Sequence, residues 1–577
     1  METLKKLKYL LDRKIKLQII FLFILVTIGS FAELLGVAII FPIVELAMGE
    51  TNLADNKISS MIMTLTNSSD KDIILLWMIA FTIIVYIIKN CYLVYMNNRL
   101  YAFSANIKRQ MATRLMRAYL KQPYSFFLQK NTSELIRSVN LDTAQLYEIV
   151  LNCLQIFSNS LTALGIIIYL SITNLVLTLT VAVLLAICAL LIIFVLQKRF
   201  RRYGLKNQIL STFLIQYLQQ AFEGIKEIKI LNNEKHFIER YGESYEEQSN
   251  IVIKYSLYNL IPKYLIEVVC IIGILGYLAF NIRFNSNYME VMPQLAVFCV
   301  AAFKLLPCVN ALYSYANTVI YHRASIDLVY KDIKEADQLE QSFDHNKSEE
   351  KEFLFEKEIE VKDLSFCYND KDGNVLDHVN MTIKKGESVA FIGTSGGGKT
   401  TLADNILSIL EPVEGTVTVD GEDVRNNIWG WRKKVGYIPQ FIYLTDDTIR
   451  NNIAFGIDEN EIDDDEVWRA LRDAQLENFV SGLKDGIHTK VGERGTRISG
   501  GQRQRIGIAR ALYRNPEVLV FDEATSALDN ETEKEVMNAI ENLQGTKTII
   551  MIAHRLSTIE HCDAVYKVEN GKAEKVR

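Results

Sequence analysis

The glycine-rich run Gly393–Thr400 has the residue types and the spacing that bind phosphate groups. It reads Gly-Thr-Ser-Gly-Gly-Gly-Lys-Thr, and it lies between an apolar run, 388–392, and a helix-forming stretch, 401–407. Glycines let backbone N–H groups curl around phosphate oxygens, and the N-terminus of the following helix adds positive potential. We therefore expect Lys399 to reach the terminal phosphates of a nucleotide and the Thr400 hydroxyl to bind Mg²⁺.

Two acidic residues, Asp522 and Glu523, follow the apolar run Val518–Phe521. Four apolar residues that end in two acids are typical of a buried parallel strand whose carboxyl end delivers carboxylates to a site. Asp522 suits water-mediated binding of Mg²⁺, and Glu523 is then placed to polarise the water that attacks a γ-phosphate. The alternative is a strand that ends in a solvated acidic turn.

A third motif, Ile498–Gln502, reads Ile-Ser-Gly-Gly-Gln and precedes a helix-forming run, 503–512. The Ser-Gly-Gly turn leaves N–H groups unsatisfied at the start of that helix, which makes a second anion site. On its own this turn fits an ordinary helix N-cap equally well.

The residues before these motifs are expected to form helices in a membrane. Between Ile149 and Gln197 there is no Asp, Glu, Lys or Arg. This stretch is more than twice the length of about 20 residues that a helix needs to cross a bilayer. The polar Ser171–Asn174 is expected to divide it into two helices. Together with the apolar segments 17–47, 72–100, 255–282 and 291–320, it gives six predicted spans.

Basic residues in the flanks predict the orientation of these spans. Residues 1–16 carry six Lys and Arg side chains, whereas the loop at 48–71 carries only Lys57 and Lys71. Because basic flanks stay in the cytoplasm, we place both termini and the C-terminal half there. The first apolar segment is too long for the core of a signal peptide. We expect a multi-pass protein of the cytoplasmic (inner) membrane.

The overall composition excludes several classes of function. With 63 basic and 68 acidic residues the net charge is −5, which gives no electrostatic basis for binding nucleic acid. The eight cysteines include no C-x-x-C pair, so the sequence indicates neither a zinc site nor a disulfide framework. The apolar segments exclude a purely soluble protein.

Two long inner loops, 100–148 and 198–254, read as helices that continue out of the membrane. Pro123 interrupts the first. The aromatic residues after it predict a short transverse element, Pro123–Phe127, that docks on the soluble half; a plain helix–helix connector is the alternative. We expect the matching turn of the second loop near Gln216–Ala221.

In this order the segments and motifs resemble the ATP-binding cassette family over the whole chain. Gly393–Thr400 matches the Walker A loop, and Val518–Asp522 matches Walker B. Ile498–Gln502 matches the signature loop, with Ile498 where the family usually has Leu. Six spans fused to one cassette are the half-transporter layout of the exporters in this family.

The resemblance implies a multi-domain fold and an activity. An all-α transmembrane domain of six helices with long cytoplasmic extensions would occupy 1–330, and an α/β P-loop ATPase cassette would occupy 358–577. The charged stretch between them, 331–357, is expected to be a solvated linker. The implied cofactors are ATP and Mg²⁺, and the implied activity is ATP hydrolysis coupled to transport.

Single residues also take roles from this resemblance. Glu523 matches the catalytic glutamate, His554 the switch histidine, and Gln440 the loop glutamine that senses the γ-phosphate and Mg²⁺. Tyr368 matches the aromatic residue that stacks on adenine, and Glu493 lies where exporters have a coupling acid. The implied D-loop is Ser526–Asp529, the implied Mg²⁺ ligands are Thr400, Gln440 and Asp522, and the implied ATP-binding residues are Tyr368, Gly393, Thr394, Ser395, Gly396, Gly397, Gly398, Lys399, Thr400, Thr401, Ser499, Gly500, Gly501, Gln502 and Asp522.

The resemblance further implies a dimer. In this family the Walker A loop of one cassette meets the signature loop of another cassette across a shared ATP. This chain carries one of each, so two chains must assemble. A homodimer with two equal sites is the simplest interpretation.

Three lysines within the apolar segments, Lys89, Lys263 and Lys304, bear on the cargo. A charge near the bilayer centre costs about 2.5–3.5 kcal/mol on insertion scales, so retained lysines need a reason. One interpretation is a basic cavity that meets an anionic, amphiphilic cargo. The alternatives are snorkelling to an interface, and pairing with acids in or near the spans. Those acids are Glu33, Glu45 and Glu267.

A narrower resemblance favours the first interpretation. The segments Ala302–Asp327 and Ile261–Tyr264, and the surroundings of Lys89, are similar to bacterial lipid-linked oligosaccharide flippases. In that subfamily such positions carry arginines that face the cavity and meet the lipid pyrophosphate. The resemblance thus implies a polyprenyl-pyrophosphate oligosaccharide as cargo. An exporter of a peptide, lipid or hydrophobic drug, and a membrane-anchored ATPase of repair or regulation, remain the alternatives.

Overall fold

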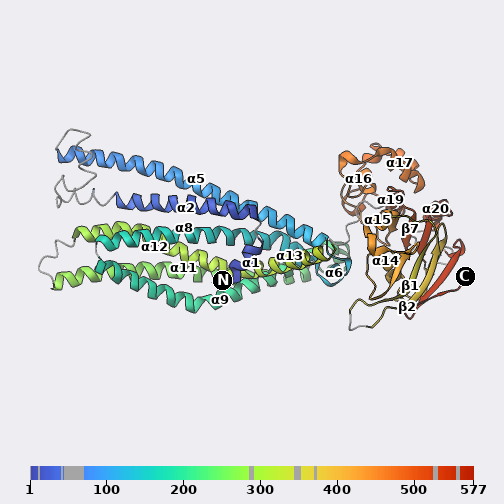
Figure 1. Ribbon diagram of the computed structural model, residues 1–577, viewed down its shortest axis with the longest axis horizontal. Helices are drawn as coiled ribbons and strands as arrows, with labels where there is room; N and C mark the ends of the chain where they lie inside the picture. The colour runs from blue at the N-terminus through green and yellow to red at the C-terminus, as the bar shows by residue number, and fades with distance from the viewer. Residues whose placement is uncertain are drawn as a thin grey trace. The chain divides into compact units, whose positions relative to one another are not determined.

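The computed structural model describes residues 2–10, 13–39, 43, 70–173, 175–284, 292–343, 353–369, 373–523, 530–553 and 559–577. The chain divides into two compact units. The first comprises Met1–Gln122 and Lys130–Leu339, and the second comprises Pro123–Gln129 and Glu340–Arg577. Figure 1 labels their elements.

The first unit is built from helices, most of them long (Figure 1). The most extensive packing joins α9 with α11 and α8 with α12, and α2 and α5 pack against α8 and against each other. Each of the six predicted spans overlaps one of these six helices; of the first, 17–47, helix α2 covers the part up to Ala38. The helices are α1 (Glu2–Leu10), α2 (Arg13–Ala38), α5 (Lys71–Leu120), α7 (Thr132–Arg137), the π-helical turn η1 (Ser138–Asp142), α8 (Thr143–Thr173), α9 (Leu175–Glu223), α10 (Ile225–Leu231), α11 (Glu234–Phe284), α12 (Met292–Tyr321) and α13 (Arg323–Phe343).

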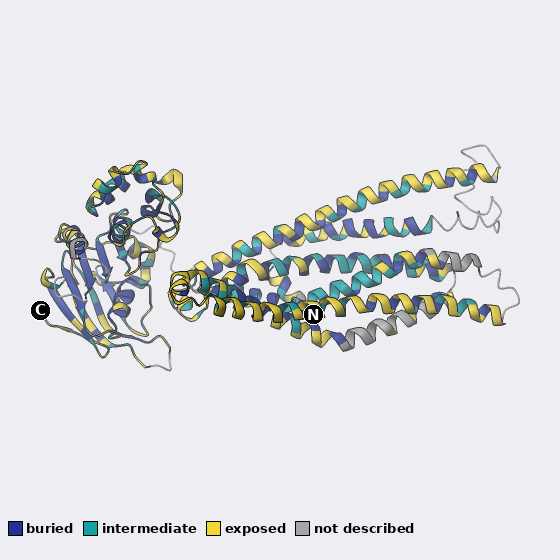
Figure 2. Cartoon of the chain, turned by 180° about the vertical axis from the view of Figure 1, so that it is seen from behind, coloured by how far each residue is buried: buried dark blue, intermediate teal, exposed yellow. Residues whose placement is uncertain are grey.

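Four stretches of the described residues are long and apolar enough to cross a membrane. They are Ile15–Ala38, Asp72–Leu120, Thr132–Ile172 and Glu234–Arg283. Large apolar side chains are exposed along these helices, for example Ile83, Ile84, Ile87 and Ile88 on α5. Figure 2 shows exposed residues along the lengths of the helices in this unit. An apolar exposed surface of this extent fits contact with lipid rather than with water.

The inner loops of the first unit turn at two places, and only one was predicted correctly. The helix α5 ends before Pro123, and the short helix α6 (Tyr124–Gln129) follows it as expected. In the second loop, however, Gln216–Ala221 lies inside α9. The chain turns instead through α10, which starts after Gly224 and is closed by Asn232 in the left-handed conformation (φ 54°).

The segment expected as a solvated linker, 331–357, begins as helix, and its residues 344–352 lie outside the described part of the chain. Helix α13 continues to Phe343 because Ile326, Val329 and Ile333 are fully buried at helical spacing while the charged residues between them stay outside. At the other end, Phe353 and Phe355 pack on Trp431 in the core of the cassette. The charged composition of this stretch thus reflects the outer face of a helix, and the cassette begins before residue 358.

The second unit contains two sheets. A four-stranded antiparallel sheet has the order β2-β1-β4-β5, and a six-stranded sheet has the order β10-β9-β3-β8-β7-β6. The strands are β1 (Glu358–Phe366), β2 (Leu376–Lys384), β3 (Ser388–Ile392), β4 (Glu414–Val419), β5 (Glu422–Asp423), β6 (Val435–Ile438), β7 (Val518–Asp522), β8 (Thr548–Ile552), β9 (Ala564–Glu569) and β10 (Lys572–Lys575).

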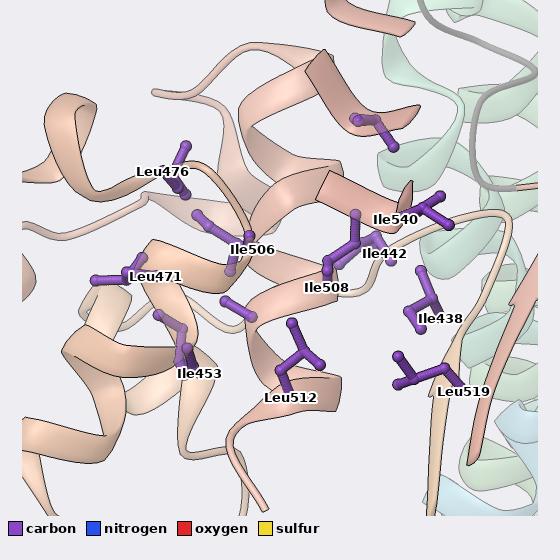
Figure 3. Packing of buried hydrophobic residues seen from close by; sticks show 14 of the residues in the cluster. Ile438, Ile442, Ile453, Leu471, Leu476, Ile506, Ile508, Leu512, Leu519 and Ile540 are labelled. Carbon is purple, nitrogen blue, oxygen red and sulfur yellow. The ribbon is translucent and has the colours of Figure 1, made fainter. Parts of the chain in front are cut away.

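The second unit also contains helices. They are α6 (Tyr124–Gln129), α14 (Lys399–Ile406), α15 (Ile428–Lys434), α16 (Ile449–Ile453), α17 (Asp464–Asp473), α18 (Glu477–Ser481), α19 (Gly500–Leu512) and α20 (Asn530–Glu541). Figure 3 shows how α19 is held: Ile506, Ile508 and Leu512 pack in one cluster with Leu471 of α17 and Leu519 of β7. This apolar cluster fixes α19, which follows the Ser-Gly-Gly turn, against the sheet.

The order of the parallel strands places the predicted motifs at one edge. Strands β3 and β7 both pair in parallel with β8, and β6 pairs in parallel with β7. The carboxyl ends of these strands lead into Gly393, Glu523 and the loop that contains Gln440. The crevice beyond the carboxyl ends of parallel strands is where such sheets bind ligands.

Candidate nucleotide-binding site and intramembrane lysines

The loop Gly393–Gly398 has the backbone of a phosphate cradle. Gly393, Gly396 and Gly398 have φ angles of 141°, 80° and 99°, which side chains other than glycine rarely adopt. A Cβ at Gly393 would lie 2.1 Å from the Val568 carbonyl oxygen, so that position has no room for a side chain. Residue 393 must therefore be a glycine if the backbone N–H groups of the loop are to turn inward.

Lys399 opens helix α14 directly after this loop. Its ammonium donates hydrogen bonds to the carbonyl oxygens of Gly393 and Thr394, at 3.0 and 2.9 Å, and only 5% of the residue is exposed. The cap residue Gly398 offers no side-chain hydrogen bond to the helix N-terminus, so the first N–H groups face the cradle. Burial lowers the pKa of Lys399, and Glu523 and Asp522 oppose that shift. The loop, the helix end and this cation fit a polyphosphate.

The residues expected to hold Mg²⁺ lie close to each other. The Tyr437 hydroxyl donates to Asp522 Oδ2 at 3.4 Å. Burial and the neighbouring Glu523 raise the pKa of Asp522, and the Thr400 hydroxyl lies near enough to that carboxyl to lower the pKa in part. A buried carboxylate beside a threonine hydroxyl is a donor set that a hard divalent cation prefers. These residues fit Mg²⁺ bound together with phosphate oxygens.

Gln440 and Glu523, both expected to be catalytic, are in direct contact. The Gln440 amide donates from Nε2 to Glu523 Oε2 at 2.7 Å. Glu523 has a φ angle of 49°, a left-handed conformation that costs a non-glycine residue energy and is common at functional sites. The turn that ends β7 thus aims the carboxylate at the Gln440 loop.

Tyr368 is also placed beside the cradle. Its hydroxyl oxygen is 2.9 Å from Thr401 Oγ1, in the first turn of helix α14 and one residue after Thr400. Its ring packs edge-on against Phe366. The Tyr368 side chain remains largely exposed. An exposed aromatic ring anchored at both ends suits stacking on a base.

The signature segment stands apart from the cradle within one chain. Ser499 and Gln502 form a capping box at the start of α19: Ser499 Oγ accepts from Gln502 N at 3.2 Å, and Gln502 Oε1 accepts from Ser499 N at 2.9 Å. Among the described residues, no hydrogen bond or ion pair joins Ser499–Gln502 to Gly393–Thr401. Ile498, where the family usually has Leu, packs against the apolar core around α19.

Two predicted elements lie outside the described residues, namely His554 and the segment Ser526–Asp529. Glu493 is exposed in the short 3₁₀ turn Glu493–Gly495. The coupling role of Glu493 stays a prediction.

Sequence reasoning missed two residues that shape this site. Asp404 lies one turn after Thr400 on α14, and burial followed by the charge of Asp522 raises its pKa to about 6. The spacing of four residues on a predicted helix could have revealed it. Arg510 of α19 donates from Nε to the Asn452 carbonyl at 2.7 Å and from Nη1 to the Tyr443 carbonyl at 2.8 Å. Arg510 thereby ties the signature helix to the segment after Gln440, and no sequence motif pointed to this contact.

Two of the three intramembrane lysines lie close together in the structure. Lys304 of α12 and Lys89 of α5 both approach Glu33 Oε2 of α2, at 3.0 and 3.6 Å. Lys263 is exposed on α11, near the ring of Tyr264, and the described contacts do not join it to the other two. Pro262 lies inside α11, so Lys263 is not at the helix end that snorkelling would favour.

Two family models and several curated proteins have sequences similar to this chain. The family model "ABC transporter transmembrane region" matches residues 17–287, and the model "ABC transporter" matches residues 376–526. The ATP-dependent lipid A-core flippase of Nitrosococcus oceani is 30% identical over 471 residues, which are 81% of this chain and 77% of that protein. The protein of the same description from Vibrio cholerae serotype O1 is 31% identical, over 81% of this chain and 80% of that protein.

A solved structure of a bacterial Atm1-family ABC exporter with ATP bound has the same fold. The TM-score is 0.78 at 21% sequence identity, over 98% of this chain and 96% of that one. The chain belongs to the ATP-binding cassette transporters, with an exporter fold, and is an ATPase that couples ATP hydrolysis to transport across a membrane.

Proposed function

We propose that two copies of this chain form an ATP-driven flippase for an anionic lipid-linked cargo in the bacterial cytoplasmic membrane. Both termini and both cassettes lie on the cytoplasmic side in this proposal, as the basic N-terminal flank predicts. The single observation that carries the cargo class is the meeting of Lys89 and Lys304 at Glu33 inside apolar helices.

Each nucleotide site is proposed to need both copies. The cradle Gly393–Thr400 and the capped turn Ser499–Gln502 belong to one cassette, but no described hydrogen bond or ion pair joins them within it. The exposed N-terminus of α19 would supply N–H groups to the γ-phosphate of an ATP held by the other copy. Because one chain carries one complete set of motifs, two identical sites result.

The geometry supports a role for each residue within a site. Lys399 would bind the terminal phosphates, and Thr400, Asp522 and Gln440 would hold Mg²⁺, which when bound would neutralise charge on the phosphate oxygens. Glu523 accepts the proton of the attacking water, and Gln440 fixes the direction of its carboxylate. His554, two positions after the end of β8 in the sequence, is assigned the role of contacting the γ-phosphate.

The charge of the intramembrane cluster supports an anionic cargo. Two ammonium groups share one carboxylate, so the cluster carries an excess positive charge in surroundings where an uncompensated charge is costly. A neutral drug would not compensate this charge, whereas a phosphate or pyrophosphate headgroup would. Lys263 is retained as a cavity lysine in this proposal, although it lies apart from the pair.

Two lipids are the leading cargoes. A polyprenyl-pyrophosphate oligosaccharide follows from the local resemblance around Lys89, Lys263 and Lys304. The lipid A-core cargo of the curated relatives is the second candidate, and the overall sequence identity favours it. Both combine a lipid, sugars and a polar head.

Transport by purified protein in vesicles tests the proposal. Fluorescent forms of the two lipids, a peptide and a neutral hydrophobic dye are supplied with ATP and Mg²⁺, and the fraction that moves across the bilayer is measured. The Glu523→Gln variant is the control without hydrolysis. We expect one of the two lipids to move and the neutral dye to stay. Movement of the peptide or the dye without either lipid would overturn the proposed cargo class.

A further inference from the structure

One carboxylate oxygen of Glu33 serves two lysines from two other helices. Glu33 Oε2 on α2 accepts a hydrogen bond from Lys304 Nζ of α12 at 3.0 Å and lies 3.6 Å from Lys89 Nζ of α5. The cluster therefore joins three predicted spans through a single acidic group.

The two lysines are held very differently. The Lys89 side chain is 4% exposed, and its ammonium lies 4.3 Å from the centre of the Tyr86 ring. The Tyr86 hydroxyl in turn donates to the Gly36 carbonyl at 2.8 Å. A Cβ at Gly36 would come within 3.3 Å of Lys89 Nζ, so a glycine at this position leaves room for the lysine. Lys89 is thus fixed in the protein.

Lys304, by contrast, is accessible. Its side chain is 39% exposed, and its hydrogen bond to Glu33 is the described contact of its ammonium. The Glu33 side chain is less exposed than that of Lys304 but is not buried. An incoming anion could therefore reach Lys304 without first disturbing Lys89 and Tyr86.

We propose that Glu33 is a resident counter-anion that the cargo headgroup displaces from Lys304. This inference rests on the proposed anionic cargo and names the residue that sets its selectivity. In the resting protein Glu33 satisfies both lysines in part, which avoids two unpaired cations in an apolar setting. Bound cargo supplies its own negative charge to Lys304 and leaves Glu33 to Lys89.

Because the cargo headgroup must displace Glu33 from Lys304, the protein selects its cargo by the charge of the headgroup. A headgroup with one negative charge offers Lys304 no more than Glu33 already provides. A pyrophosphate or other multiply charged headgroup attracts the ammonium more strongly, since Coulomb attraction scales with charge. Glu33 would therefore discriminate against singly charged lipids, such as the free fatty acids and phospholipids of the membrane.

Removing the charge of Glu33 tests this role. Glu33→Gln keeps the shape of the side chain but frees Lys304 from an anionic partner. We measure the stimulation of ATP hydrolysis in vesicles by a polyprenyl pyrophosphate and by the methyl ester of a polyprenyl phosphate, a phosphodiester that carries one negative charge. The concentration for half-maximal stimulation by the pyrophosphate is expected to fall about fivefold, since a partly exposed ion pair no longer competes. The phosphodiester is expected to be inactive on the unaltered protein and to stimulate the variant.

Glu267→Gln is the matched control, because Glu267 is an exposed acid on α11 in another predicted span. It is expected to leave both lipid responses unchanged. Glu33→Asp keeps the charge, but its side chain is one methylene group shorter, so its carboxylate reaches less far toward Lys304. It should shift the pyrophosphate response in the same direction as Glu33→Gln and by less, which keeps the inference testable if the Gln variant fails to fold.

The outcomes separate this inference from the proposed function. If the unaltered protein responds to pyrophosphate lipid but Glu33→Gln responds equally or less well, Glu33 is part of the binding site rather than a competitor, and the inference fails alone. If no anionic lipid stimulates the unaltered protein while a neutral compound does, the proposed cargo class and this inference both fail.

Discussion

The Gln440 side-chain amide donates a hydrogen bond to the Glu523 carboxylate, with 2.7 Å between Nε2 and Oε2. The two residues are 83 positions apart in the chain and meet because β6 and β7 are parallel neighbours. A carboxylate that is held by an amide keeps one oxygen in a fixed direction. This fixed direction suits the proposed role of Glu523 as the base for the attacking water.

Glu523→Gln is expected to abolish steady-state ATP hydrolysis while ATP binding persists. The amide keeps the size of the side chain and its contact to Gln440 but accepts no proton from water. General-base catalysis contributes about 10²–10⁴-fold, so the residual rate should fall by at least two orders of magnitude. Phosphate release and nucleotide binding are measured on the same preparation. A variant with full turnover would remove Glu523 from the mechanism.

Lys399→Ala should show the opposite pattern. The change removes the cation that we assign to the terminal phosphates, so nucleotide binding itself weakens. Equilibrium binding of ATP to the two variants distinguishes them: Glu523→Gln retains affinity, and Lys399→Ala loses it. Equal affinity for ATP in Lys399→Ala and the unaltered protein would contradict the assignment.

Much of the nucleotide site was predictable because each motif carries its own local structure. Gly393, Gly396 and Gly398 stand where positive φ angles are needed, and the apolar run before Asp522 is the buried parallel strand that the composition indicates. The contacts between motifs were not predictable in this way. The Gln440–Glu523 bond depends on the strand order, which the spacing along the chain does not reveal.

The errors in the predicted fold arose because charged or polar segments were taken to be exposed to water along their whole length. The stretch after Lys331 is charged, yet Ile333 on its inner face is fully buried, so α13 continues. The turn of the second inner loop was placed too early because Gln216–Ala221 is polar. Gly224 and Asn232 end the helices there instead, since both residues adopt conformations that helices do not continue.

Asp404 predicts a dependence of stability on pH. Burial, and after it the charge of Asp522, raises the pKa of Asp404 from 3.8 to about 6. The folded protein thus favours the neutral acid, so the contribution of Asp404 to stability is fully present below pH 4 and is lost as the pH rises through 6. Asp404→Asn, which resembles the neutral acid, should stabilise the cassette by about 1–3 kcal/mol at pH 8 and not at pH 4.

Thermal unfolding of the full chain in EDTA, followed by tryptophan fluorescence, measures this effect. Three of the four tryptophans, Trp429, Trp431 and Trp468, lie in the cassette, so the signal reports mainly on that unit. Asp485→Asn, at an exposed acid, is the control and should not change the midpoint at either pH. An Asp404→Asn gain that is equal at pH 4 and pH 8 would contradict the assigned pKa.

Asp142 predicts a stability effect in the first unit. This fully buried carboxylate accepts hydrogen bonds from Gln208 at 3.0 Å and Ser325 at 2.7 Å, and Arg137 Nη2 lies 3.4 Å away. It joins the π-helical turn η1 to α9 and α13. Asp142→Ala leaves a buried arginine without its partner and should cost about 3–5 kcal/mol.

Asp142→Asn is the matched variant, because its amide oxygen still accepts from Gln208 and Ser325. Its loss of stability should be smaller than that of Asp142→Ala, since only the ion pair to Arg137 is removed. The midpoint of thermal unfolding of the purified full chain compares the three proteins. An Ala variant as stable as the unaltered protein would show that the cluster does not hold these helices together.

From the short helix α6 we predict that mutations can separate lipid transport from ATP hydrolysis. Its chain segment, Pro123–Gln129, falls in the same compact unit as the cassette, and none of its residues is buried. Tyr124 is exposed, and Phe126 is half-buried with its ring edge-on to that of Phe127. The docking role of this segment stays a prediction.

Replacing Tyr124 and Phe126 with Ala should therefore reduce lipid transport more than ATP hydrolysis, because the cassette would still turn over without moving the membrane helices. Transport and phosphate release are measured in the same vesicles, and Leu128→Ala, at an exposed aliphatic residue of the same helix, is the comparison. The ratio of lipid moved to ATP hydrolysed should fall several-fold in the double variant. A ratio that stays constant while both rates decline would assign α6 a merely structural role as a connector.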